Sequence, residues 1–156
     1  MRSFGVALMV VALSACATTG PVARAARAQQ NLATVLAFVD MAFNRHEVEQ
    51  AFRLYVGPEY REHNPHVADG KDSVIKALVG YTHEMYPELR QEVKRTIAQG
   101  DLVAVHLFET RSAAERTAGR GRALIDIFRL EHGRIVEHWD VVQDVPEQPV
   151  NDNTMF

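Results

Sequence analysis

The stretch Arg122 to Asp144, RALIDIFRLEHGRIVEHWDVVQD, decides the fold. Its first half alternates with the period of two that is typical of a pleated strand. Glu131–Arg134 predicts a turn, because Gly133 readily takes a positive φ. Ile135–Val142 is rich in β-branched and aromatic residues and predicts the return strand. The first strand divides into two faces, with Leu124, Asp126, Phe128 and Leu130 on one and Ile125, Ile127 and Arg129 on the other.

Polar side chains interrupt this hairpin. Asp126 lies among large apolar residues, and His138 and Asp140 share one face of the return strand, since residues i and i+2 point the same way. At ~3.3 Å of rise per residue, they stand roughly 6.5–7 Å apart. Trp139 faces the other side. An unpaired charge is costly to bury, so these three residues indicate a catalytic site. The alternative is that the two aspartates lie on a solvent-exposed face of the sheet or pair with arginines.

Composition indicates one globular domain. The chain has 156 residues, of which 47% are apolar and 24% charged. The net charge is −3 and the pI about 6.1, with Lys and Arg scattered, which argues against a nucleic-acid partner. Seven histidines make a metal site worth considering.

The N-terminus has the pattern of an export signal. Residues 1–15, MRSFGVALMVVALSA, place a basic residue before the apolar run Phe4–Leu13, which is too short to span a bilayer. Residues 13–16 (LSAC) resemble the bacterial lipobox, whose cysteine is lipidated. The resemblance implies an exported lipoprotein anchored through Cys16, in the periplasm and, given Ala17, at the outer membrane. The alternatives are an ordinary signal peptide with a chance cysteine, or a misread start.

Helices are expected before the strands. Gln29–Asn44 carries apolar residues at helical spacing, and Val48–Leu54 continues as a second short helix. A third helix begins near Asp69–Asp72 and ends before Pro87. Between signal and domain, residues 16–27 predict the lipidated cysteine and a flexible tether, which leaves the domain itself at residues 28–145.

A non-helical segment, Tyr55–Gly70, concentrates polar side chains. His63, Asn64 and His66 fall within four of its residues, and Pro65 favours an extended chain before it. Polar groups on a loop beside a rigid scaffold are candidates for binding. The alternative is a surface loop whose Asn and His make local turn hydrogen bonds.

Further strands are expected at Leu89–Gln99 and Leu102–Thr110, joined by a turn at Gly100-Asp101. Arg111–Gly121 predicts a polar loop, and residues 146–156 predict a loose tail. Helices followed by a run of antiparallel strands predict an α+β domain, with the helices packed on one face of a curved sheet.

Several motifs together resemble the SnoaL-like polyketide cyclase family, within the nuclear-transport-factor-two-like (NTF2-like) superfold. The likeness covers about residues 30–145, and its last motif is the most diagnostic. It implies a cone-shaped α+β fold, in which a curved antiparallel or mixed sheet is wrapped by N-terminal helices around a pocket. The matching residues are Tyr60–Pro65 (YREHNP), Asp69-Gly70, Gly100–Val103 (GDLV), Asp126–Arg129 (DIFR) and Gly133–Asp140 (GRIVEHWD).

The resemblance also implies a chemistry. The cyclases use an aspartate on the last strand as a general base, which removes a proton α to a carbonyl before aldol ring closure. Asp140 has the position of that base, Asp126 has that of its polar partner, and His138 completes the predicted catalytic group. His63 and Asn64 match a motif at the rim of the pocket.

The expected ligand is a small apolar or carbonyl-containing molecule, and no cofactor is expected. His66, His106 and Phe128 join the predicted ligand-binding set, His106 on the condition that its face of the strand is inward. A homodimer is expected from the resemblance. The chain departs from the family at Leu124, where the cyclases carry a polar residue and limonene epoxide hydrolase, a fold relative, carries an arginine, so epoxide hydrolysis is not expected.

Two other interpretations stay open. The first is a non-catalytic, lipid-anchored module that holds a small ligand in the cell envelope. The second is a metal site built from His63, His66, His138 and a carboxylate, which would suit zinc or a similar ion. No HExxH motif or paired cysteines accompany these histidines.

Overall fold

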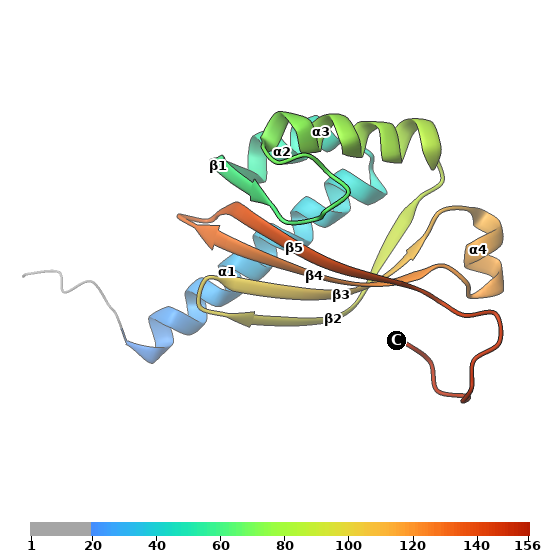
Figure 1. Cartoon of the computed structure of the whole chain (residues 1–156). Helices are drawn as coiled ribbons and strands as arrows, with labels where there is room; N and C mark the ends of the chain where they lie inside the picture. Colours follow the sequence, from blue (N-terminus) through green and yellow to red (C-terminus); the bar gives the residue numbers. More distant parts are fainter. Residues whose placement is uncertain (1–19) are drawn as a thin grey trace, which may run out of the picture.

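A five-stranded mixed sheet, in the order β1-β5-β4-β3-β2, forms the body of the computed structural model, which describes residues 20–156. β1 runs parallel to β5, and the other neighbours are antiparallel. Helices lie over one side of the twisted sheet, and the C-terminal segment loops back on the other side (Figure 1). The elements are α1 (Pro21–Val39), η1 (Asp40–Asn44), α2 (Val48–Tyr55), β1 (Val56–Glu62), α3 (Lys71–Val79), η2 (Gly80–Met85), β2 (Arg90–Gln99), β3 (Leu102–Thr110), α4 (Ala113–Ala118), β4 (Arg122–Glu131) and β5 (Arg134–Asp144).

The core lies between the helices and one face of the sheet. In β3 the inward side chains Val103, Val105 and Leu107 are fully buried, while the side chains between them are partly exposed. Phe38 of α1 packs edge-on against Phe128 of β4, with ring centroids 6.0 Å apart. A buried aromatic ring of this kind contributes about 1.5–3 kcal/mol, so these contacts hold α1 against the sheet.

The register of the central hairpin brings the predicted polar residues together. β4 pairs with β5 so that Asp126 lies opposite Asp140 and Phe128 opposite His138. All four therefore share the face that the helices cover, because directly opposite residues in an antiparallel pair point the same way. The α+β fold with a curved mixed sheet, predicted from the sequence, is confirmed.

Two π-helical turns end the first and third helices. Asn44, the last residue of η1, donates from Nδ2 to the backbone oxygen of Gln91 at 3.0 Å and accepts from its backbone N–H at 2.8 Å. This side chain satisfies both backbone groups of one residue of β2, and so fastens the end of the first helix to the sheet.

Several segments differ from the sequence expectation. α1 begins at Pro21, so residues 21–27 of the predicted tether are helical; proline suits the first turn of a helix, and alanine and arginine favour the turns that follow. β1 is a strand where an irregular segment was expected, because pairing with β5 outweighs the turn signal of its Gly-Pro. The predicted loop 111–121 contains the short helix α4, capped by Ser112.

The C-terminal tail also departs from expectation. Phe156 is half-buried and packs on the outer face of the sheet, with its ring centroid 4.6 Å from Phe108 and 5.6 Å from His106. The last residue is therefore tied down, although most of the segment before it is exposed.

The predicted signal peptide and the lipidation site Cys16 lie outside the described residues. Within residues 20–156, no helix combines the length and the apolar character needed to cross a bilayer.

Candidate functional site

Two carboxylates face each other across β4 and β5. Asp126 is only 4% exposed, and its Oδ1 has no hydrogen-bond partner among the described residues. Asp140 is partly exposed, and its Oδ2 accepts a hydrogen bond of 2.7 Å from Nδ2 of Asn64. The pair thus combines a buried carboxyl with a more accessible one.

Burial changes the acidity of Asp126. Desolvation is the largest cause and raises its pKa to about 7; the nearby His138 lowers it, and Asp140 raises it further. A carboxyl with this pKa is about half protonated at pH 7, so Asp126 can donate a proton where an exposed aspartate would be fully ionised.

His138 lies between these carboxylates and a third one. Its Nδ1 is 2.9 Å from Oε1 of Glu62, and its ring packs against Phe128 at a tilt of 31°, with centroids 4.9 Å apart. Burial alone lowers the pKa of His138, but the hydrogen bond to Glu62 leads the causes that outweigh it, so the pKa lies above its ordinary value.

Glu62 is held by several donors. The Tyr60 hydroxyl donates to its Oε2 at 2.7 Å, and the backbone N–H groups of Asn64 and His63 donate to its Oε1 at 2.9 and 3.0 Å. Burial raises the pKa of Glu62, but the hydrogen bond with His138 leads the causes that bring it below its ordinary value. Glu62 is therefore a carboxylate. The burial of Tyr60 itself, followed by the charge of Glu62, raises the pKa of the Tyr60 hydroxyl.

The structure brings Asp126, Asp140, His138, Asn64 and Phe128 into this site. The sequence interpretation missed Tyr60 and Glu62. Both belong to the motif YREHNP, and their i, i+2 spacing would have put them on one face of a strand, had β1 been recognised.

The other predicted binding residues lie elsewhere. His63 stacks on Trp139 at 4.7 Å and bonds through Nε2 to Glu137 at 2.9 Å, on the outer face of the sheet. His66 is exposed. His106 also faces outward, because Val105 and Leu107 beside it take the inward positions of β3. The three side chains do not join Asp126 and Asp140.

The histidines proposed as metal ligands are separated in the same way, since His63 and His138 bond to different glutamates on opposite faces of the sheet. Within residues 20–156, no group of three or more His, Cys, Asp or Glu side chains is arranged to hold a metal ion.

A second polar group lies on the inward face, four residues along β4 from Asp126. Buried Glu109 pairs with Arg122 and accepts hydrogen bonds from Tyr81 at 2.8 Å and from Gln91 at 2.9 Å. The Glu109 charge is matched by Arg122, although Oε1 of Gln91 has no hydrogen-bond partner among the described residues. The paired charge indicates a structural role: the group joins η2 to β2, β3 and β4.

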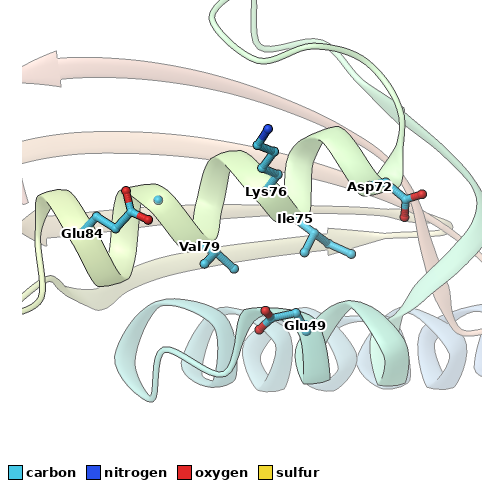
Figure 2. Close-up of a pocket in the computed structure, with 7 residues that line it drawn as sticks. Glu49, Asp72, Ile75, Lys76, Val79 and Glu84 are labelled. Atoms are coloured by element: carbon cyan, nitrogen blue, oxygen red, sulfur yellow. The ribbon is translucent and has the colours of Figure 1, made fainter.

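Surface hollows lie away from the carboxylates. One, of about 480 Å³, lies between α2 and α3; Figure 2 shows Ile75 and Val79 pointing toward the helix that carries Glu49. Another, of about 650 Å³, lies beside the β4–β5 turn and is lined by Asn31 and His132, among others. The candidate site therefore rests on the arrangement of its side chains.

A family model for SnoaL-like polyketide cyclases matches residues 33–147. The chain belongs to this family. A comparison with curated proteins gave no match.

Solved structures show the same fold. A proposed SnoaL-like polyketide cyclase from Jannaschia sp. CCS1 has a TM-score of 0.59 and 20% identity, covering 73% of this chain and 85% of that one. AclR, a proposed hydroxylase from Streptomyces galilaeus, has a TM-score of 0.60 and 23% identity, covering 74% and 90%. A proposed ketosteroid isomerase from Kribbella flavida DSM 17836 has a TM-score of 0.60 and 16% identity, covering 79% and 84%.

Proposed function

We propose that this SnoaL-like protein is an enzyme that removes a proton from the carbon next to a carbonyl group of a small molecule, with Asp140 as the general base. The observation that carries the proposal is the opposed pair of Asp126 and Asp140, two carboxyls in unlike surroundings beside an imidazole. Pairs of titratable groups whose surroundings separate their pKa values are typical of acid–base sites.

In the proposed step, the more accessible carboxylate of Asp140 takes the α-proton. The electron pair of the broken C–H bond forms the C=C bond of an enolate, and negative charge develops on the carbonyl oxygen. Asp126, with a pKa near 7, and His138, whose pKa is raised, supply hydrogen-bond donors for that oxygen. The enolate then takes this proton back from Asp140, at the α-carbon or, in a conjugated enolate, at the γ-carbon. Alternatively, its α-carbon attacks a second carbonyl to form a C–C bond, and the alkoxide formed there takes the proton from Asp140.

Asn64 supports the base. Its amide donates to Oδ2 of Asp140 at 2.7 Å, which fixes the carboxylate while leaving its other oxygen for the substrate. Structural neighbours described as a proposed cyclase and a proposed isomerase agree with this class of chemistry.

Thermal unfolding tests whether a ligand uses the proposed base. Purified protein is heated with acetylacetone, cyclohexanone or 4-nitrophenol, the last as an enolate mimic, and Asp140→Asn is compared with the wild type. A ligand at 100 times its Kd adds about 2.7 kcal/mol to the free energy of unfolding. At ~2–4 °C per kcal/mol, Tm rises by several degrees.

Asp144→Asn is the matched control, because Asp144 is an exposed aspartate on the same strand. The proposal predicts a ligand-dependent rise in Tm that Asp140→Asn abolishes and Asp144→Asn keeps. A rise that is equal in all three proteins contradicts the role of Asp140, and favours the alternative of a binding module without catalysis.

We also propose attachment to the envelope through Cys16, on the lipobox-like residues 13–16 alone. Expression with a radiolabelled fatty acid tests this: the full chain becomes labelled and partitions into detergent, and Cys16→Ser does not. Equal labelling of both proteins contradicts the anchor.

A further inference from the structure

One oxygen of Glu62 contacts both His138 and the backbone of Asn64, the residue that holds Asp140. Oε1 contacts Nδ1 of His138 at 2.9 Å and accepts the backbone N–H groups of His63 and Asn64. The Glu62 side chain is 3% exposed, and its other oxygen is taken by Tyr60. A buried carboxylate with this many donors is fixed in position and strongly favours its charged form.

We propose that Glu62 is a positioning residue, which holds His138 as an imidazolium and directs the Nε2–H of that ring to the oxygen of the substrate. The inference rests on the proposed function and deepens it. It assigns Asp140 to the carbon-bound proton and His138 to the developing oxyanion.

The hydrogen bonds determine which nitrogen is available. Among residues 20–156, the hydrogen-bonded nitrogen of the His138 ring is Nδ1, which lies against Glu62. A carboxylate accepts and does not donate, so Nδ1 carries a proton. Nε2 is then the nitrogen left for a ligand, and whether it donates or accepts depends on the charge of the ring.

The charges around His138 favour the imidazolium. The titratable groups that act on it are Glu62 from β1, Asp126 from β4 and Asp140 from its own strand, and all three are acids. No basic side chain within residues 20–156 opposes them among these contacts. A protonated ring beside buried carboxyls is what an oxyanion site needs, because the donor is in place before charge develops.

Glu62 also links His138, the proposed hydrogen-bond donor, to Asp140, the proposed base. Glu62 accepts the backbone N–H of Asn64 and so fixes the start of the loop after β1. The side chain of Asn64 in turn holds Asp140. The Oδ1 of Asn64 accepts the N–H of His66, so the amide cannot turn over without losing that bond. One buried carboxylate thereby orients His138 directly and Asp140 through Asn64.

An NMR titration of the histidine rings tests the inference without any substrate. Two-bond ¹H–¹⁵N spectra report the protonation of each ring nitrogen, and the wild type is compared with Glu62→Gln. We expect His138 to titrate above its ordinary pKa in the wild type. Loss of a charge-assisted hydrogen bond of about 1.5–3 kcal/mol should weaken proton binding by tenfold or more in Glu62→Gln.

Glu137→Gln is the matched control. It removes another 2.9 Å contact between a glutamate and a histidine, that of Glu137 with His63, on the outer face. It should leave the titration of His138 unaltered. Tyr60→Phe, which removes one donor to Glu62, is a milder second variant should Glu62→Gln fold poorly. Its effect on the titration of His138 should be small, or opposite in direction to that of Glu62→Gln.

Definite results overturn the inference. A wild-type His138 that titrates below the ordinary histidine pKa contradicts the imidazolium, and this result needs no variant. A His138 titration that is the same in folded Glu62→Gln contradicts the role of Glu62.

Turnover separates this inference from the proposed function. Where α-proton exchange depends on Asp140, Glu62→Gln should lower kcat at least tenfold with little change in KM, and an unchanged kcat overturns the positioning role. Absence of exchange with every compound overturns the proposed function, and with it the role of His138 at the oxyanion. The NMR titration still decides, independently, whether Glu62 sets the charge of His138.

Discussion

Asp126 occupies a position in β4 where the alternation calls for an apolar side chain. The residues on either side of it on the inward face, Leu124 and Phe128, are buried, and Asp126 is buried with them. An unpaired carboxyl in such a place is destabilising when charged, and the protein keeps it by raising its pKa.

Asp126→Asn tests this through pH. The pKa of Asp126 is raised from 3.8 to about 7, so its favourable contribution is complete below pH ~4 and is lost as the pH rises to 7. At about 1.4 kcal/mol per pKa unit, the loss approaches ~4 kcal/mol. Asparagine does not titrate, so the variant should gain stability relative to the wild type between pH 4 and pH 8, measured by urea unfolding. A difference that stays constant with pH contradicts the buried, protonated carboxyl.

Gly121 is the glycine that the fold cannot replace. Its φ is +152°, and a Cβ placed there would lie 2.2 Å from the backbone oxygen of Glu109. Gly121→Ala should therefore destabilise by about 2–4 kcal/mol, read as a fall in Tm. Gly80→Ala is the control, because Gly80 has helical dihedrals and nothing within 4 Å of its Cβ position. It should leave Tm equal or higher. Equal effects of the two substitutions would contradict the close approach.

At the scale of elements, local periodicity was sufficient for the main part of α1, for α2 and α3 and for β2 to β5, since alternation and helical spacing are properties of neighbouring residues. It missed α4 and the first turns of α1. The same alternation put Asp126, His138 and Asp140 on one face. β1 could not be predicted, because its residues pair with β5, about 75 residues away in sequence, and its own Gly-Pro indicates a turn.

The misplacement of His106 has a related cause. Alternation says that His106 and Val105 point to opposite faces, but only packing against the helices decides which face is inward. In the structure Val105 is fully buried and His106 is partly exposed. His63, just after β1, turns outward for a similar reason, since the ring of Trp139 offers an aromatic surface on that side.

The tail offers a test at this scale. Phe156 contacts the rings of Phe108 and His106, and the Lys94 ammonium lies 5.6 Å from its ring centroid. Phe156→Ala should lower the free energy of unfolding by about 1 kcal/mol, because the ring is only half-buried. Replacement of Val150, which is fully exposed in the same segment, by alanine should change nothing measurable. Equal stability of the Phe156 variant and the wild type contradicts the docking of the tail.

At the scale of the whole molecule, the homodimer expected from the sequence stays a prediction. The outer face of the sheet carries exposed apolar side chains, among them Ile97 at 72% and Val141 at 71% exposure. If copies associate through this face, light scattering should give the mass of two chains for the wild type and of one chain for Val141→Glu. A wild-type mass equal to that of one chain contradicts the expected homodimer.

The organisation of the molecule places its unusual chemistry on one face of one sheet. Helices α1 to α3 cover that face, β4 and β5 carry the carboxyls and the imidazole, and β1 brings Glu62 beside them. The family and the fold could be predicted from the sequence, because the motifs that indicate them consist of neighbouring residues. The roles of Glu62 and Tyr60 required the contact between β1 and β5, which only the folded chain displays.

The measurement that tests the central claim most directly is exchange of α-protons with solvent. Ketones and 1,3-dicarbonyl compounds are incubated in D₂O with the wild type, Asp140→Asn or Asp144→Asn, and deuterium incorporation is followed by ¹H NMR. We predict that the wild type and Asp144→Asn accelerate exchange of at least one compound, and that Asp140→Asn lowers this rate by 100-fold or more, the size of effect expected on losing a general base, roughly 10²–10⁴. Exchange at the wild-type rate in folded Asp140→Asn would show that Asp140 is not the base.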